Sequence, residues 1–131
     1  MHRLQTRLVI VFLVALVAAV AAGCGGSSTS AVTKVDAAKA VGMLDSRTVI
    51  DVRTPAEFAA GHVAGARNID VEAADFATQV GSLDKKAPYL LYCRSGRRSA
   101  LAADQMAGMG FTDIVDGGGM ADLVAAGALT E

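Results

Sequence analysis

The sequence predicts a three-layer α/β domain, in which a central parallel sheet of about five short strands carries helices on both faces. Short apolar runs alternate along the chain with segments of helical spacing, and strands that alternate with helices pair in parallel through right-handed crossovers. The run at 89–92 is continuous and apolar, as expected for a strand covered on both faces. A length of 131 residues allows one such domain and no second core.

The first 23 residues have the three parts of an export signal and are set aside from the fold. Arg3 and Arg7 supply the positive start. The apolar run at 8–22 is 15 residues long, shorter than the roughly 20 residues with which an α-helix crosses a bilayer. The sequence therefore favours a signal peptide over a permanent transmembrane anchor.

Small residues at 21–23 lead directly into Cys24, as in the lipobox where bacterial signal peptides are cut and the new N-terminal cysteine is acylated. We expect residues 1–23 to be a lipoprotein signal peptide, and residues 24–31 to comprise the lipidated Cys24 and a flexible tether. The domain at 32–131 would then lie on the extracytoplasmic side of a membrane, in the periplasm or at the cell surface. The alternatives are cleavage nearby by ordinary signal peptidase and an uncleaved anchor.

Capping residues mark the first two helices of the domain. Asp36 is the expected N-cap of the first helix. The apolar, β-branched run at 48–52 predicts a buried strand. Thr54, Pro55 and Glu57 then form a capping box with proline at the first helical position, which starts the second helix.

Apolar spacing and glycine predict the remaining elements. Apolar residues at 73, 76, 77 and 80 share one helical face, and Gly110 ends the Ala-rich helix that follows the strand at 89–92. In order, we expect a helix at 36–44, a strand at 48–52, a helix at 54–60, a strand at 66–69, a helix at 71–83, a strand at 89–92, a helix at 99–109, a strand at 112–115 and a helix at 120–126.

Cys93 is the residue on which the functional prediction depends. The sequence holds two cysteines, so with Cys24 acylated Cys93 has no partner for a disulfide within the chain. It must be buried and inert, paired with another molecule, or reactive. Cys93 follows a buried strand and precedes a helix, which is where ligands bind in open parallel sheets.

The loop that begins at Cys93 favours the thiolate over the thiol. Gly96 allows successive backbone N–H groups to point inward as an anion-binding nest, and the helix that starts near Ser99 adds the positive end of its dipole. Such surroundings lower a cysteine pKa from about 8.5 to between roughly 3.5 and 7.5. We expect the same loop to hold a sulfur-containing anion, with Arg94 and Arg98 favoured over Arg97 as contacts; its residues are Arg94, Ser95, Gly96, Arg97, Arg98 and Ser99.

Four motifs in succession resemble those of the rhodanese (thiosulfate sulfurtransferase) family. They are Asp51-Val52-Arg53-Thr54-Pro55-Ala56-Glu57-Phe58, Gly61-His62-Val63-Ala64-Gly65-Ala66-Arg67-Asn68-Ile69, Tyr92-Cys93-Arg94-Ser95-Gly96-Arg97-Arg98-Ser99 and Gly117-Gly118-Gly119-Met120. The resemblance implies a rhodanese-like fold over residues 32–127 and transfer of sulfane sulfur, through a persulfide on Cys93, from a donor such as thiosulfate to cyanide or a thiol. A protein thiol is a further possible partner. The resemblance does not select thiosulfate over polysulfide, mercaptopyruvate or a protein persulfide, and Leu123 stands where the family often has tryptophan.

Other polar residues in these motifs are expected to support the site rather than react. Transfer through a preformed thiolate needs no general base, so Asp51 and Arg53 are interpreted as an ion pair, Glu57 as a helix cap and His62 as a packed turn residue. The glycines at 117–119 are interpreted as a turn, because the Lys-Ser/Thr of a nucleotide site is missing. With two histidines, one of them in the export signal, we expect no metal site and no cofactor.

Two other functions remain open from the sequence. A non-catalytic rhodanese-like module could bind a partner or sense redox state. A phosphatase or arsenate reductase would need Cys-x5-Arg, but position 99 is serine and the nearby arginine is Arg98. The whole chain has 12 Lys and Arg against 13 Asp and Glu, two of the arginines lie in the export signal, and the other charges are scattered, so we expect no surface for nucleic acid.

Overall fold

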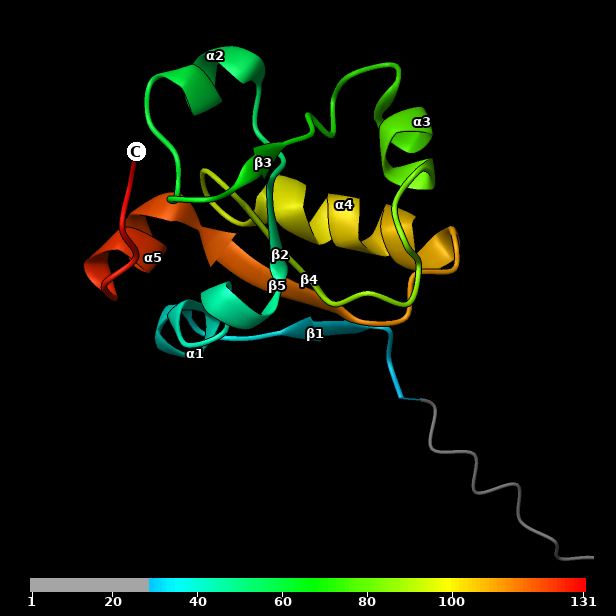
Figure 1. Ribbon diagram of the computed structural model, residues 1–131, viewed down its shortest axis with the longest axis horizontal. Coiled ribbons are helices and arrows are strands. Elements are labelled where there is room, and N and C mark those ends of the chain that lie inside the picture. Colours follow the sequence, from blue (N-terminus) through cyan, green and yellow to red (C-terminus); the bar gives the residue numbers. More distant parts are fainter. Residues whose placement is uncertain (1–28) are drawn as a thin grey trace, which may run out of the picture.

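The computed structural model describes residues 29–131 (Figure 1). The predicted signal peptide, Cys24 and most of the tether lie outside this range. Within it, no helix is long and apolar enough to cross a membrane. The described chain forms an α/β domain of five strands, five α-helices and one short 3-10 helix at Leu44–Ser46.

Five strands form one sheet in the order β1-β5-β4-β2-β3, and every pairing is parallel. Strand β4 lies at the centre and is buried along its whole length. All carboxyl ends therefore meet at one edge of the sheet, where the Cys93 loop lies. The strands are β1 (Val32–Lys34), β2 (Thr48–Asp51), β3 (Arg67–Asn68), β4 (Tyr89–Cys93) and β5 (Ile114–Gly119).

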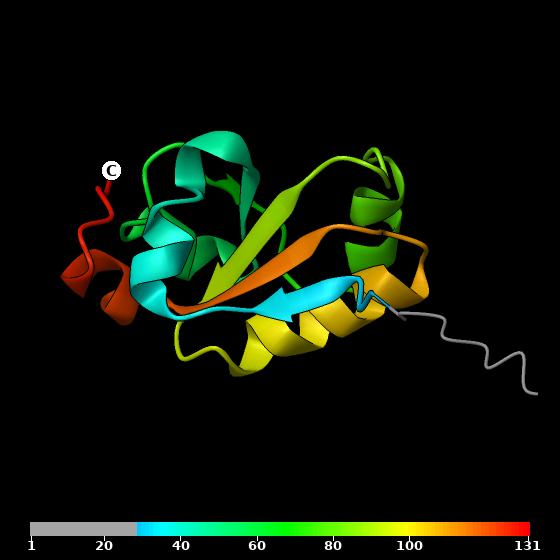
Figure 2. The ribbon, with the colours of Figure 1, turned by 90° about the horizontal axis from the view of Figure 1, so that it is seen from below.

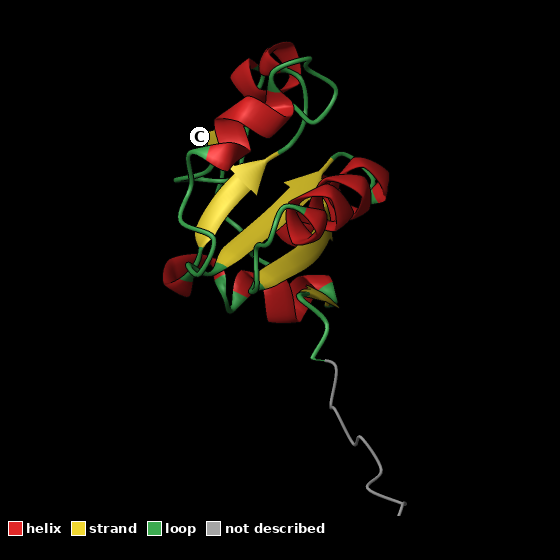
Figure 3. Ribbon diagram, turned by 90° about the vertical axis from the view of Figure 1, so that its right-hand side faces the viewer, coloured by secondary structure: helices red, strands yellow, loops and turns green. Residues whose placement is uncertain are grey.

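Helices cover both faces of this sheet, which confirms the three-layer prediction (Figures 2 and 3). Helices α3 (Phe76–Gly81) and α4 (Arg97–Gly108) contribute to the core cluster that contains Leu91 and Cys93. Helices α1 (Ala37–Val41) and α5 (Met120–Ala125) contribute to the cluster on the opposite face. Helix α2 (Pro55–Ala59) follows the end of β2 and begins with the predicted capping box.

Several predicted boundaries are wrong, among them those of the first helix, expected at 36–44 and found at Ala37–Val41, and of the last strand, expected at 112–115 and found at Ile114–Gly119. Three of the differences have a local reason. Helix α4 starts at Arg97, because Gly96 takes a left-handed conformation with φ 92° and lets the helix begin immediately after it. Helix α3 is shorter than predicted, because the Asp70 carboxylate accepts the N–H of Glu72 in a turn that precedes the helix. The glycines at 117–119 form the end of β5 rather than a turn.

The last glycine of β5 lies against the Cys93 loop. A Cβ atom at Gly119 would be 2.8 Å from the backbone oxygen of Arg94, a distance that real Cβ atoms essentially never show. Gly117 is also closely packed, because a Cβ there would be 3.2 Å from the backbone oxygen of Leu91. The absence of a side chain at Gly119 therefore allows the loop to pack directly on β5, and its absence at Gly117 allows β5 to lie close to β4.

We predict that Gly119→Ala destabilises the domain by about 1–3 kcal/mol, because the added methyl displaces loop backbone. The matched control is Gly108→Ala, at the last residue of α4, where a Cβ would meet nothing within 4 Å. Urea denaturation of both variants and the native chain measures the difference. Equal unfolding midpoints for the two alanine variants would contradict the close packing at Gly119.

Candidate active site

The Cys93 side chain lies at the carboxyl end of β4 and is fully buried. Its sulfur accepts the backbone N–H of Gly96 at 3.0 Å. The left-handed conformation of Gly96 turns the chain back over the sulfur, and residues with a side chain rarely adopt it. The loop therefore encloses the sulfur and presents a backbone donor to it.

Ser99 is the second polar group beside the sulfur. It lies in the first turn of α4, and its hydroxyl oxygen is 3.7 Å from the Cys93 sulfur. Its oxygen is also 2.7 Å from a carboxylate oxygen of Asp116 on β5. The start of a 12-residue helix thus faces the thiol, with the positive end of its dipole.

The loop lowers the pKa of Cys93 below its ordinary value. Burial is the largest single influence and acts in the opposite direction, because it disfavours the charged form. Hydrogen bonds from the backbone N–H and hydroxyl of Ser99, and from the N–H groups of Ser95 and Gly96, together outweigh it. Hydrogen bonding is therefore the main source of the predicted preference for the thiolate, and Cys93 also interacts electrostatically with Arg98, whose pKa it raises.

Arg98 supports the loop from the side. Its guanidinium group binds both carboxylate oxygens of Glu57 at 2.8 Å, and it lies 3.6 Å from a carboxylate oxygen of Glu72. Glu57 also accepts the backbone N–H and the hydroxyl of Thr54 at the start of α2. This geometry ties the loop to α2 and does not fit the expectation that Arg98 contacts a ligand ahead of Arg97.

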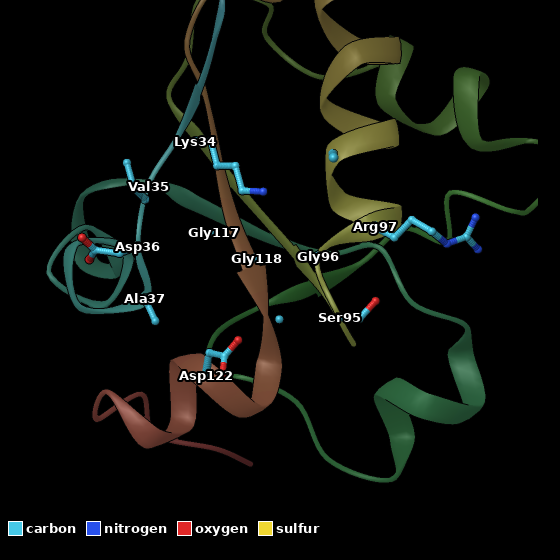
Figure 4. Close-up of a pocket in the computed structure, with 12 residues that line it drawn as sticks. Lys34, Val35, Asp36, Ala37, Ser95, Gly96, Arg97, Gly117, Gly118 and Asp122 are labelled. Atoms are coloured by element: carbon cyan, nitrogen blue, oxygen red, sulfur yellow. The ribbon is translucent and has the colours of Figure 1, made fainter.

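Arg94 and Arg97 are the exposed cations of the loop. Neither guanidinium group forms a hydrogen bond or ion pair with any residue from 29 to 131. Arg97, but not Arg94, lines an open pocket of about 490 Å³, whose wall also includes Gly96, Lys34 and Asp122 (Figure 4). Gly96 both lines this pocket and donates to the sulfur, whereas Cys93 itself is fully buried and does not line it.

The predicted Asp51 and Arg53 pair lies on the other face of the sheet from the sulfur. Asp51 is fully buried, and Arg53 binds its carboxylate with distances down to 2.7 Å. The Tyr92 hydroxyl donates to Asp51 and accepts the N–H of Val63. Burial and the hydrogen bond to Asp51 raise the pKa of Tyr92, so this hydroxyl stays protonated.

His62 occupies the turn after α2, in a packed position. Its ring stacks on Phe58 with centroids 3.6 Å apart, and Nδ1 lies 3.0 Å from the Phe58 carbonyl oxygen. Its Nε2 lies 3.4 Å from a carboxylate oxygen of Glu131. These contacts fit the structural role expected for His62. Among residues 29–131, no three His, Cys, Asp or Glu side chains are grouped to hold a metal ion.

Two residues near these sites were missed in the sequence. Asn68 donates to the backbone oxygens of Asp51 and Arg53 and holds the end of β2. Asp116 is 2% exposed and lies beside Ser99. A carboxylate within the apolar run that forms β5 was a signal that could have found Asp116.

A family model described as the rhodanese-like domain matches residues 35–123. The chain belongs to the rhodanese-like domain family. Among curated relatives of this rhodanese-like domain, the thiosulfate sulfurtransferase GlpE of Pseudomonas putida is 43% identical over 77 residues, which cover 56% of this chain and 67% of the relative. GlpE of Ectopseudomonas mendocina is 40% identical over 73 residues, covering 53% and 64%. The match thus spans about two thirds of the length of these relatives.

Solved structures agree with the family assignment. The rhodanese-like domain of the Anabaena sp. Alr3790 protein has a TM-score of 0.67 and 26% identity, covering 75% of this chain and 77% of that one. A rhodanese with anions from E. coli has a TM-score of 0.55 and 32% identity, covering 65% and 96%. The rhodanese-like domain described here is accordingly a sulfurtransferase of the rhodanese type.

We predict that the Glu57–Arg98 pair stabilises the rhodanese-like domain in a pH-dependent way. Hydrogen bonds from Arg98 and Thr54 lower the pKa of Glu57 from 4.5 to about 2. A carboxylate with a lowered pKa contributes stability above its unfolded value and loses it as the pH falls through the folded value. The unfolding free energy of the native chain should therefore exceed that of Glu57→Gln at pH 7, and the difference should shrink from about pH 4.5 toward pH 2.

Denaturant titrations of both proteins across this pH range measure the difference. Glu72→Gln serves as the control, because its carboxylate is more exposed and lies farther from Arg98. A native-minus-Glu57→Gln difference that does not change with pH would argue against the ion pair.

Proposed function

We propose that this sulfurtransferase carries sulfane sulfur on Cys93 as a persulfide, taking it from a small anionic donor such as thiosulfate and passing it to cyanide or a thiol. One observation carries the proposal: the buried sulfur of Cys93 accepts the Gly96 N–H at 3.0 Å, in a loop whose donors lower the thiol pKa. The name of the GlpE relatives, thiosulfate sulfurtransferase, supports the choice of donor.

The first half of the reaction loads the cysteine. The Cys93 thiolate attacks the sulfane sulfur of thiosulfate, a new S–S bond forms, and sulfite leaves with the electron pair of the bond that breaks. The product is a persulfide anion on Cys93. The total charge does not change, so the N–H groups that stabilise the thiolate can stabilise the persulfide in its place.

The second half of the reaction removes the outer sulfur from the Cys93 persulfide. Cyanide or a thiolate attacks the outer sulfur, the S–S bond to Cys93 breaks, and its electron pair returns to the cysteine sulfur as a thiolate. The starting enzyme is regenerated without any oxidant. Backbone N–H groups oriented by Gly96 and α4 favour departure of this thiolate for the same reason that they favour its formation.

Arg94 and Arg97 are proposed to attract the anionic donor. Thiosulfate carries two negative charges, and both guanidinium groups are exposed in the loop that begins at Cys93, with Arg97 also lining the pocket. Arg98 is assigned to support instead, because Glu57 binds it on two nitrogens. Because Glu57 binds Arg98, this arginine is not free to bind a phosphate, as the arginine of a phosphatase loop would.

We propose further that the domain works outside the cytoplasm, held at a membrane by a lipid on Cys24. The export-signal pattern at 1–23 and the small residues before Cys24 support this location. A thiol on a small molecule or on another exported protein would then be the acceptor. Mass spectrometry of the native protein should show an acylated N-terminal Cys24, and a free, unmodified chain beginning at Met1 would contradict the location.

Incubation of the Cys24→Ala chain with thiosulfate should add one sulfur atom to Cys93. Cyanide should then remove the added sulfur and release thiocyanate. Intact-mass measurement and peptide mapping check both steps, with Cys93→Ser as the matched control that acquires no sulfur. A chain that gains no cyanide-labile sulfur from thiosulfate, polysulfide or mercaptopyruvate would favour the non-catalytic binding or redox-sensing module.

Arg94→Ala and Arg97→Ala should each raise the KM for thiosulfate by up to about fivefold, because an exposed charge pair contributes about 0.2–1 kcal/mol. The effect should diminish at high salt, while kcat changes less. Steady-state kinetics at two ionic strengths measure it, with Lys86→Ala as a control for loss of an exposed cation elsewhere. An unchanged KM in the double variant would show that these arginines do not bind the donor.

A further inference from the structure

The open pocket beside the Cys93 loop carries charges of both signs, whereas a thiosulfate donor would call only for positive ones. Its wall is formed at the ends of β1 and β5 and at the starts of α1, α4 and α5. Lys34 and Arg97 contribute positive charge to it, and Asp36 and Asp122 contribute negative charge. A volume of about 490 Å³ lies in the range of pockets that bind small molecules.

Bare backbone forms the floor of this pocket. Strand β1 ends at Lys34, which pairs with Asp116, and the Val35 N–H donates to the Asp116 backbone oxygen at 3.3 Å where the pairing ends. Strand β5 continues to Gly119. The three glycines at 117–119 line the pocket, and on this side no strand within residues 29–131 pairs with them. An unpaired strand end without side chains is a surface on which an extended peptide can lie.

Two of the four charges have another role or direction. The Asp36 carboxylate caps α1, where it accepts the N–H of Lys39 at 2.8 Å, and Arg97 points away from the glycine floor (Figure 4). Lys34 and Asp122 are exposed, and neither side chain forms a hydrogen bond or ion pair with a residue from 29 to 131. Figure 4 shows them on opposite sides of the floor. The pocket therefore has one positive end and one negative end.

A ligand with opposite charges at its two ends matches this arrangement. A doubly negative anion such as thiosulfate would be attracted by Lys34 but repelled by Asp122. A short free peptide has a carboxylate at one end and an ammonium group at the other, joined by an extended backbone of roughly 3.3 Å per residue. Such a peptide offers a partner to Lys34 and to Asp122 at once.

The same pocket adjoins the loop that holds the sulfur. Ser95 and Gly96 line it, and their N–H groups are among those that lower the pKa of Cys93. Cys93 itself is buried and does not line the pocket. A persulfide extends one S–S bond, about 2 Å, beyond the Cys93 sulfur. A ligand in the pocket therefore needs a side chain that reaches this outer sulfur across the loop, and a cysteine between the two charged ends supplies one.

We propose that this pocket binds the sulfur acceptor, a short peptide thiol whose carboxylate lies at Lys34, whose ammonium group lies at Asp122 and whose cysteine reaches across the loop to the persulfide. The inference rests on the proposed function, because it names the acceptor class of the same reaction. The peptide thiolate attacks the outer sulfur, the S–S bond to Cys93 breaks, and its electron pair returns to the cysteine sulfur. The product is a peptide persulfide, and no oxidant is needed.

The test uses the Cys24→Ala chain, loaded from thiosulfate, with the tripeptide glycyl-cysteinyl-glycine as acceptor. The peptide is supplied with both ends free, with the amino end acetylated, with the carboxyl end amidated and with both ends blocked. Lys34→Ala should raise the KM of the free and acetylated peptides by up to about fivefold, the size of an exposed charge pair, and leave that of the amidated peptide unchanged. Asp122→Asn should raise the KM of the free and amidated peptides by a similar factor and leave that of the acetylated peptide unchanged.

Matched controls remove the same charges outside the pocket. They are Lys86→Ala and Asp75→Asn, both at exposed positions that do not line it. Transfer to cyanide, an acceptor without an ammonium group or a carboxylate, corrects each variant for a general loss of activity.

Two kinetic results would overturn the proposal. The first is an effect of Lys34→Ala or Asp122→Asn that does not depend on which end of the peptide is blocked. The second is a native pocket that uses the doubly blocked peptide with the same KM as the free one, which would indicate a cysteine within a protein chain as the acceptor.

Binding can also be measured without sulfur transfer. Glycyl-seryl-glycine has the same charged ends and no thiol, so it should shift the amide resonances of residues 117–119 in NMR spectra of the Cys24→Ala chain, and should bind more weakly to Lys34→Ala and Asp122→Asn. Peptide binding by a chain that acquires no sulfur would refute the proposed function and leave the peptide site standing. Sulfur transfer to cyanide without peptide binding at these glycines would overturn the peptide site alone.

Discussion

A sulfur anion inside a folded domain has to be stabilised by donors that are already in place, and this requirement governs the site. Burial alone disfavours the Cys93 thiolate. The Gly96 N–H at 3.0 Å and the donors of Ser95 and Ser99 reverse that preference. They can do so because the chain leaves a buried central strand, turns at one left-handed glycine and immediately enters a helix. The reactive group is therefore a product of the strand, turn and helix together.

The surrounding contacts keep this loop in one shape. Glu57 joins the start of α2 to Arg98, and the glycine-rich end of β5 allows the loop backbone to pack against the sheet. On the opposite face, Asp51, Arg53 and Tyr92 form a separate network that holds the ends of β2 and β4. Most charged residues of these motifs therefore hold the backbone in place in one of the two networks. Arg94 and Arg97 are the exceptions, because they remain exposed at the surface of the loop.

The sequence was sufficient for the parts that depend on local pattern. Capping residues predicted α2, the apolar run predicted β4, and Cys93 followed from its place between a strand and a helix. Contacts between distant segments could not be predicted in this way. Arg98 pairs with Glu57, which lies 41 positions away in the chain. The sequence does not show this pair, and the prediction therefore gave Arg98 to ligand binding. Asp116 drew no attention, because its partner Ser99 reaches it only after β5 and α4 pack together. The buried Leu123 shows that the last helix packs without the tryptophan common in the family.

The most direct test of the central claim is the ionisation of Cys93 itself. In the Cys24→Ala chain, the ultraviolet absorbance of the thiolate can be followed against pH, with Cys93→Ser subtracted to remove the tyrosine signal. The account predicts that half of the thiolate absorbance develops clearly below about pH 8.5, the value of an unperturbed cysteine. A midpoint at or above that value would show that burial outweighs the loop donors, and would contradict the account.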